Sequence, residues 1–219
     1  MSAWLAPPLN ALAWLVSQVL LSASRAWTGV RPLWRGASLR PGQRVYFANH
    51  GSHGDFVMIW ACLPPHLRRA TRPVAGQDYW LASPLRRFAA ARVFRALLID
   101  RHPQPGGPSP IDLMGQALAR GESLILFPEG TRNTTDAVLL PFKSGLHRLS
   151  QLHPEVEFVP VWIDNIRRVI PKGELIPVPM VCTVSLGTPL AITPGEDKDA
   201  FLQRAREAVL ALRPEESQT

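Results

Sequence analysis

The sequence predicts an α/β fold, a single layered domain in which helices flank a central mixed β-sheet, preceded by an N-terminal apolar helical region. Short apolar segments typical of buried strands alternate along the chain with segments of helical spacing, which is the pattern of a layered α/β domain. The 219 residues fit one domain and are enough to bury a sizeable core. The first 24 residues contain no charged side chain, which sets them apart from the rest.

Each predicted element follows from local periodicity and from the turn residues that bound it. The strand 123–127 (SLILF) is continuously apolar and runs into Pro128. Ser52, with Asp55 three residues later, is the predicted N-cap of the helix 53–62. The predicted helices are 9–27, 53–62, 83–94, 109–121 and 196–212, and the predicted strands are 44–48, 72–76, 95–100, 123–127, 156–163 and 180–186.

The charge of the chain is unevenly distributed. Residues 1–95 hold twelve arginines, no lysine and only two acidic residues, whereas the remainder holds twelve basic and fifteen acidic residues. A one-sided cationic surface favours an anionic partner, either phospholipid head groups or nucleic acid. No nucleic-acid-binding motif accompanies it, and most tryptophans lie in the same half, so we expect a membrane phospholipid surface and no nucleic acid.

The N-terminal segment is predicted to associate with that surface. The helix 9–24 would be roughly 24 Å long, which is shorter than a hydrocarbon core of about 30 Å. Tryptophans bracket a set of arginines after it, as expected for a helix that lies in the interface. We therefore predict a membrane-associating region at 1–36 and the α/β domain at 37–219. A core helix of a soluble domain, a single membrane span and a secretory signal are the alternatives.

The two cysteines, Cys62 and Cys182, are too few for a disulfide framework. We expect both to be buried free thiols in a reducing compartment. The chain has no cluster of cysteine and histidine with zinc spacing, so no structural metal is predicted.

A cluster of titratable side chains follows the predicted strand 44–48. In ANHGSHGDF, His50 and Asp55 are five residues apart, so on one regular helix they would lie about 140° from each other and could not meet. If His50 lies in a turn and Asp55 in the first helical turn, Gly51 and Gly54 allow the chain to fold back. The carboxylate would then orient the imidazole and leave its other nitrogen as a general base. An ordinary polar turn is the alternative.

The segment FPEGTRN, directly after the strand 123–127, presents charged side chains at a strand end. Gly130 permits a sharp turn there, so that Glu129 and Arg132 are displayed where open α/β sheets bind their ligands. Arg132 can grip a phosphate bidentately. The alternative is a turn with an exposed arginine.

Two further segments carry candidate anion-binding groups. LLIDR places Asp100 and Arg101 at the end of another predicted strand, for which a surface ion pair is the alternative. PFKSG places Lys143 beside a glycine.

Together, these segments resemble the glycerolipid acyltransferase family of the 1-acylglycerol-3-phosphate acyltransferase type. The blocks of that family are Asn-His followed four residues later by Asp, a block ending in Ile-Asp-Arg, Phe-Pro-Glu-Gly-Thr-Arg, and an apolar Val-Pro-Val type strand. The matching residues are Asn49, His50 and Asp55; Ile99, Asp100 and Arg101; 127–132, followed by Phe142, Lys143 and Gly145; and Val159, Pro160 and Val161. The resemblance covers roughly residues 40–190 and identifies the α/β domain as a glycerolipid acyltransferase domain.

The resemblance implies transfer of an acyl group from acyl-CoA or acyl carrier protein to the hydroxyl of a lysolipid. The first choice of acceptor is 1-acylglycerol-3-phosphate, which gives phosphatidate; another lysophospholipid or a lyso-aminolipid is the alternative. His50 would remove the hydroxyl proton and Asp55 would support the imidazolium. The implied substrate-binding residues are Glu129 at the glycerol oxygen, Gly130 and Thr131 in the same motif, and Arg101, Arg132 and Lys143 at the phosphate.

No metal is implied, and no cofactor beyond the acyl-CoA or acyl carrier protein cosubstrate. With the N-terminal segment, the resemblance predicts a location on the cytoplasmic face of the inner (plasma) membrane. A lipid hydrolase is the first competing interpretation, although no serine is framed as a nucleophile. A non-catalytic lipid-binding protein of the same fold is the second.

Two positions depart from the family pattern. The second block usually opens with glycine where this chain has Arg95, and a lysine that helps bind phosphate commonly follows Val-Ala where this chain has Gly76 and Gln77. One phosphate-binding cation is therefore expected to be missing. His53 occupies a variable position of the first block, so we assign it no catalytic role.

Overall fold

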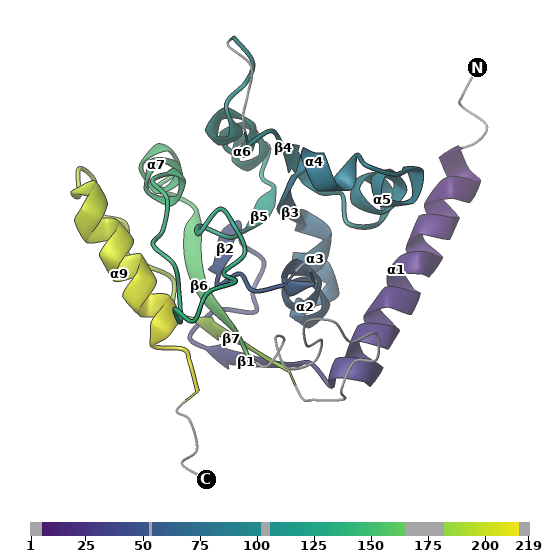
Figure 1. Ribbon diagram of the computed structural model, residues 1–219, viewed down its shortest axis with the longest axis horizontal. Coiled ribbons are helices and arrows are strands. Elements are labelled where there is room, and N and C mark those ends of the chain that lie inside the picture. Colours follow the sequence, from purple (N-terminus) through teal and green to yellow (C-terminus); the bar gives the residue numbers. More distant parts are fainter. Residues whose placement is uncertain (1–5, 53, 102–105, 165–181, 215–219) are drawn as a thin grey trace.

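A seven-stranded mixed β-sheet forms the centre of the molecule (Figure 1). The computed structural model describes residues 6–52, 54–101, 106–164 and 182–214. The strands are β1 (Arg31–Arg35), β2 (Arg44–Ala48), β3 (Thr71–Gly76), β4 (Leu97–Ile99), β5 (Ser123–Leu126), β6 (Glu157–Asp164) and β7 (Thr183–Gly187). Their order is β1-β7-β6-β2-β5-β3-β4, and β6 and β7 form the antiparallel pair in an otherwise parallel sheet. The predicted α/β class with a mixed sheet is confirmed.

Helices cover both faces of this sheet. The helical segments are α1 (Ala6–Thr28), α2 (Asp55–Cys62), α3 (Pro65–Ala70), α4 (Gln77–Trp80), α5 (Pro84–Phe88), the π-helical turn η2 (Ala89–Val93), α6 (Pro110–Ala119), α7 (Gly145–Leu152) and α9 (Lys198–Leu210). One core lies between the sheet and α1, α2, α3 and η2, and the other lies between the sheet and α6, α7 and α9 (Figure 1). Tyr46 and Ala48 of β2 join the first core and Val45 and Phe47 the second, because successive strand side chains point to opposite faces.

The carboxyl ends of four strands meet at one edge of the sheet, because β2, β5, β3 and β4 are neighbours and run parallel. Asn49 extends the pairing of β2 with β6 past the last strand residue. Its side-chain nitrogen donates to the carbonyl of Ile163 at 3.0 Å, and its oxygen accepts from the Ile163 N–H at 2.8 Å. The segments that follow these strands therefore leave the sheet close together.

The predicted alternation of strands and helices is confirmed, but α1 and α2 begin at other residues than predicted. α1 begins at Ala6 and includes the proline pair in its first turn, where backbone N–H groups have no helical partner. The prediction of Ser52 as an N-cap is wrong, because α2 begins at Asp55 with Gly54 as its N-cap. The Asp55 carboxylate instead accepts from the Ser52 N–H at 2.9 Å.

Four described elements are absent from the sequence prediction, namely β1, α3, α4 and α7, of which α3 and α4 have only six and four residues. β1 carries Pro32 and two arginines, lies at the sheet edge and pairs with β7. α7 is a short amphipathic helix whose Leu146 and Leu149 are buried.

The predicted division of the chain after residue 36 stays a prediction, and β1 within the first 36 residues is part of the sheet. Of the predicted strand 180–186, residues 180 and 181 lie outside the described residues.

α1 packs against the domain along one side and leaves the other side open. Ala13 and Leu21 are buried in the first core. Exposed apolar side chains occupy the opposite side, namely Leu12, Trp14, Leu15 and Val19. Within the described part of the chain, none of the helices has the length and apolar character needed to span a membrane.

Candidate active site

His50 and Asp55 meet at the carboxyl end of β2. The chain turns between the end of the strand at Ala48 and the start of α2, so the two side chains face each other in the way that a single helix would forbid. His50 Nδ1 lies 2.8 Å from Asp55 Oδ2, and the Asp55 side chain is fully buried. The same oxygen accepts from the Gly51 N–H at 2.7 Å and the Ser52 N–H at 2.9 Å.

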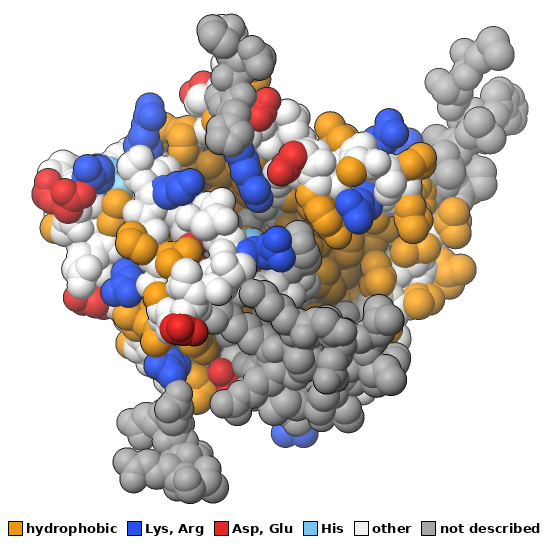
Figure 2. Space-filling view, in the orientation of Figure 1, with side chains coloured by type: hydrophobic (Ala, Val, Ile, Leu, Met, Phe, Trp, Pro, Cys, Tyr) orange, Lys and Arg blue, Asp and Glu red, His pale blue; other side chains and the backbone are white. Residues whose placement is uncertain are grey.

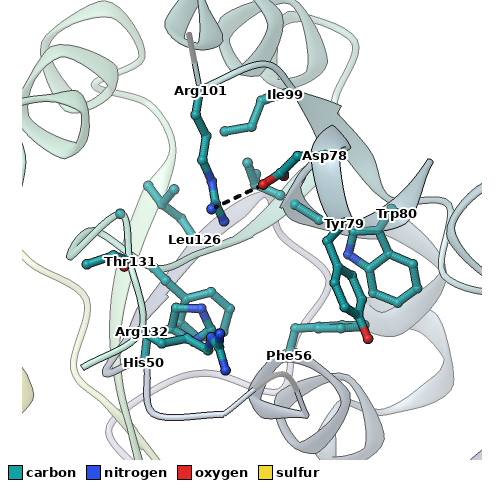
Figure 3. Close-up of a pocket in the computed structure, with 15 residues that line it drawn as sticks. His50, Phe56, Asp78, Tyr79, Trp80, Ile99, Arg101, Leu126, Thr131 and Arg132 are labelled. Atoms are coloured by element: carbon teal, nitrogen blue, oxygen red, sulfur yellow. Dashed lines mark ion pairs between the residues drawn. The ribbon is translucent and has the colours of Figure 1, made fainter. Parts of the chain in front are cut away.

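This arrangement fixes the imidazole tautomer. A carboxylate oxygen only accepts hydrogen bonds, so the proton of the neutral His50 ring lies on Nδ1 and Nε2 keeps its lone pair. His50 is partly exposed and lines a pocket at the end of the sheet (Figure 3). An imidazole oriented in this way can accept a proton from a bound hydroxyl.

The loop after β5 holds His50 from a second direction. The Phe127 ring stacks on the imidazole, with ring centres 4.2 Å apart and an angle of 17° between the planes. The His50 N–H donates to Glu129 Oε1 at 2.7 Å, and the His50 carbonyl accepts from the Asn133 N–H at 2.7 Å. His50 is therefore positioned through both its ring and its main chain.

Glu129 is a buried support for this loop. Besides its bond to His50, its Oε2 accepts from the Leu140 N–H at 2.9 Å, and its side chain is not among those that line the pocket. The predicted contact of Glu129 with the glycerol oxygen stays a prediction. In this structure both carboxylate oxygens accept from backbone amides, so the residue positions its neighbours.

Sequence reasoning assigned no role to Asn133, the last residue of FPEGTRN. The residue is buried, and its side chain donates to the Ala137 carbonyl at 2.6 Å and accepts from the Thr135 N–H at 3.0 Å. These bonds fix the conformation of the loop, so that the Asn133 N–H donates to the His50 carbonyl. Its place directly after the motif was the available signal, but its contact with His50 depends on the tertiary fold.

Gly130 and Lys143 pack against each other beside the pocket. Gly130 has a φ of +70°, and a Cβ at this position would lie 2.7 Å from Lys143 Cε. Only glycine meets both requirements. Gly130 lines the pocket together with Thr131 and Arg132, whereas Lys143 contacts Gly130 and is not among the lining residues.

The pocket has a volume of about 350 Å³ and combines charged and aromatic walls (Figure 3). Arg101, at the end of β4, and Arg132 supply cationic groups, and Asp78 of α4 lies 3.9 Å from Arg101 as an ion pair. Besides His50 and Thr131, the other lining side chains are aromatic or aliphatic, namely Phe56, Val74, Ala75, Tyr79, Trp80, Ile99, Leu126 and Phe127. Figure 2 shows a hollow with hydrophobic walls that extends across this face toward α1.

The structure locates both departures from the family pattern. Arg95 precedes β4, at the opposite end of that strand from Arg101, and donates to the Arg69 carbonyl at 2.9 Å. It therefore does not replace the missing phosphate-binding cation. A Cβ on Gly76 would lie 2.5 Å from Asp78 Oδ1 and 2.9 Å from Arg101 Nε, so the space beside Gly76 is filled by this ion pair.

Neither cysteine is suited to act as a nucleophile. Burial raises the pKa of the Cys62 thiol to about 12, with nearby Arg25 opposing the shift, and burial raises the pKa of Cys182 to about 11. The thiolate is the nucleophilic form, so neither thiol is reactive near neutral pH. His53 lies outside the described residues.

The sequence that forms most of this fold matches a known class of protein. The family model described as Acyltransferase matches residues 35–164, which is more than half of the chain. The chain therefore belongs to the acyltransferase family.

Two proteins to which the chain is similar are both 1-acylglycerol-3-phosphate acyltransferases. The chain is 27% identical to the 1-acyl-sn-glycerol-3-phosphate acyltransferase of Cocos nucifera over 170 residues, which cover 74% of this chain and 51% of that protein. It thus spans about half the length of this relative. The crystal structure of the 1-acyl-sn-glycerophosphate acyltransferase PlsC from Thermotoga maritima matches with a TM-score of 0.67 and 18% identity, covering 93% of this chain and 83% of that chain. The two proteins share a fold.

Proposed function

We propose that this protein transfers a fatty acyl group from the thioester of acyl-CoA or acyl carrier protein to the free hydroxyl of a lysolipid. The observation that carries the proposal is the His50–Asp55 pair, in which Nδ1 of His50 lies 2.8 Å from the buried Asp55 carboxylate while His50 lines a pocket. The same pocket exposes Arg101 and Arg132, which suit a phosphate group.

The proposed reaction needs no covalent enzyme intermediate. The acceptor hydroxyl donates to His50 Nε2, which takes its proton as the oxygen attacks the thioester carbonyl. Asp55 stabilises the imidazolium that forms. Collapse of the tetrahedral intermediate breaks the carbon–sulfur bond, and the imidazolium returns its proton to the departing thiolate, which leaves an ester, a free thiol and a neutral imidazole.

The acceptor proposed first is 1-acylglycerol-3-phosphate, which would give phosphatidate. Both relatives described above are named for this acceptor. Arg101 and Arg132 would bind its phosphate from two strand ends, with Lys143 in contact with the glycine of the motif. The hydrophobic side chains in the pocket suit the acyl chains of donor and acceptor.

The proposed location is the cytoplasmic face of the inner (plasma) membrane, with α1 in the interface. The exposed apolar side chains of α1 would enter the bilayer, and the arginines concentrated in residues 1–95 would contact anionic head groups. Leu81 and Leu85, exposed next to the pocket wall formed by α4, would lie in the same interface. A lysolipid could then reach the pocket from the membrane.

The release of free thiol from acyl-CoA, measured with and without lysophosphatidate, tests the proposal. Transfer predicts release that depends on the acceptor. Release without an acceptor would instead identify a thioester hydrolase. No release with any lysolipid, from a protein that is folded and binds vesicles, would identify a lipid-binding protein and reject the proposal.

A further inference from the structure

α4 brings an acidic and an aromatic wall to the same pocket that holds the two arginines. Asp78, Tyr79 and Trp80 are consecutive residues, and all of them line the pocket. Figure 3 shows Asp78 beside the guanidinium of Arg101, with Tyr79 and Trp80 across the pocket from His50. None of these three residues is needed to deprotonate a hydroxyl or to bind a phosphate monoester.

Asp78 opposes the binding of a dianion at the arginine site. Its carboxylate lies 3.9 Å from Arg101, and the side chains of Asp78 and Arg101 are 68% and 49% exposed. A phosphate monoester carries nearly two negative charges at neutral pH. The ionised carboxylate repels that charge and competes with it for Arg101, whereas a phosphodiester, with one negative charge, is repelled less.

The same wall has the chemistry that recognises an ammonium group. A carboxylate attracts the charge directly, and aromatic faces attract cations through their quadrupole. The Tyr79 ring already holds one cation in this way, because the Arg86 guanidinium lies 4.1 Å from its centre. Trp80, whose ring meets Phe56 edge to face at 5.8 Å between centres, offers a second ring beside Asp78.

We propose that the pocket accepts a second class of acceptor, lysophospholipids with a zwitterionic head group. The phosphodiester binds Arg101 and Arg132, and the ammonium group binds the Asp78 carboxylate and the adjacent aromatic side chains. Asp78 lies directly beside Arg101, which matches a head group whose ammonium is separated from the phosphate by a two-carbon link. The inference rests on the proposed acyl transfer and names a substrate class for the same site.

An acceptor panel with the variant Asp78→Asn tests this assignment. The acceptors are lysophosphatidylcholine, lysophosphatidylethanolamine, lysophosphatidylglycerol and lysophosphatidate with one acyl chain, in mixed micelles with one labelled acyl-CoA. We expect the variant to lower kcat/KM for the two zwitterionic acceptors about two- to five-fold, mainly through KM, because an exposed charge interaction is lost. The kcat/KM values for lysophosphatidylglycerol and lysophosphatidate rise, because the repulsion is removed.

Two further variants guard against an indirect effect. Asp78→Glu keeps the carboxylate and should restore the use of the zwitterionic acceptors. Asp199→Asn makes the same charge change at an exposed position of α9 and should leave all four values unchanged. Changes of opposite sign for the two groups of acceptors cannot come from a general loss of folding.

The proposal is overturned if the wild-type enzyme acylates lysophosphatidate but neither zwitterionic acceptor, or if Asp78→Asn changes all four values in the same direction. In both cases the acyl transfer itself stands. If no acceptor supports thiol release, the proposed acyl transfer itself is rejected, and the assignment of zwitterionic acceptors is rejected with it.

Discussion

His50 is restrained by groups from two segments that are distant in sequence. Asp55 orients its ring through Nδ1, and Phe127 stacks on the imidazole face. Glu129 and Asn133 hold its backbone N–H and carbonyl. In the proposed reaction His50 is the general base and must lie within hydrogen-bonding distance of the hydroxyl, so small shifts of this residue would slow the reaction.

We expect Glu129→Gln to impair both stability and catalysis. The glutamine oxygen can accept from either the His50 or the Leu140 N–H, but its NH2 group then faces the other donor. Leaving one buried amide unpaired should lower the free energy of unfolding by about 1–3 kcal/mol. Urea denaturation and the kcat for acyl transfer measure the two effects.

Glu155→Gln, at an exposed position that contacts His153, is the matched control for Glu129→Gln. It should change neither the free energy of unfolding nor kcat. Wild-type stability and kcat in Glu129→Gln would show that the paired amides do not depend on the carboxylate.

The two cysteines should resist alkylation in the folded protein. With thiol pKa values raised to about 12 and about 11 by burial, both remain protonated at pH 8, where an exposed cysteine is partly thiolate. Iodoacetamide should therefore label neither thiol at pH 8 until urea unfolds the chain, as followed by intact mass. Rapid labelling of the folded enzyme would contradict the buried positions.

At the scale of elements, the parallel strands β2, β3, β4 and β5 create the site, because their carboxyl ends open onto one edge of the sheet. The amino ends of these strands face the other way and carry structural contacts. Arg95 illustrates this, since it lies before β4 and its carbonyl accepts from Arg72 Nε at 2.7 Å.

The φ of +51° at Arg95 gives a prediction about the turn that precedes β4. Arg95→Ala and Arg95→Gly both remove the guanidinium, but only glycine adopts this backbone conformation without strain. The glycine variant should exceed the alanine variant in free energy of unfolding by about 1 kcal/mol. Both should retain kcat because Arg95 lies away from the pocket, and equal stabilities in urea would contradict the strain.

Most strands and the longer helices of the core could be predicted because their periodicity is local, whereas the short helices α3, α4 and α7 were missed. β1 was missed because Pro32 and its flanking arginines resemble a loop, and only its pairing with β7 makes this edge segment a strand. The meeting of His50 with Asp55 was predicted as one of two alternatives. The main-chain contacts of Glu129 and Asn133, and the α4 wall of the pocket, depend on tertiary packing that local spacing does not encode.

At the scale of the whole molecule, the proposed membrane contact rests on the exposed apolar side chains of α1 and on the concentration of arginines in the first half of the chain. We expect Trp14→Glu combined with Val19→Glu to release the protein from vesicles of phosphatidylglycerol and phosphatidylcholine in a flotation assay. Burial of each apolar side chain contributes up to about 1.5–3 kcal/mol, so the partition coefficient should fall by more than about ten-fold.

Leu152→Glu is the control for the vesicle experiment, because Leu152 is 62% exposed, similar to Trp14 at 65%, but belongs to α7 on the other side of the sheet. It should leave flotation unchanged. Equal loss of binding in both variants would contradict the assignment of α1 as the membrane-facing helix.

The central claim is that His50 is the general base of an acyl transfer, and formation of labelled phosphatidate tests it most directly. Wild type and His50→Ala are incubated with lysophosphatidate and radiolabelled acyl-CoA, and the product is separated by thin-layer chromatography. Circular dichroism and vesicle flotation establish that the variant remains folded and bound. We predict that the rate falls by at least about 10²-fold in His50→Ala, because the proton acceptor is lost. Phosphatidate formation at the wild-type rate would contradict the account.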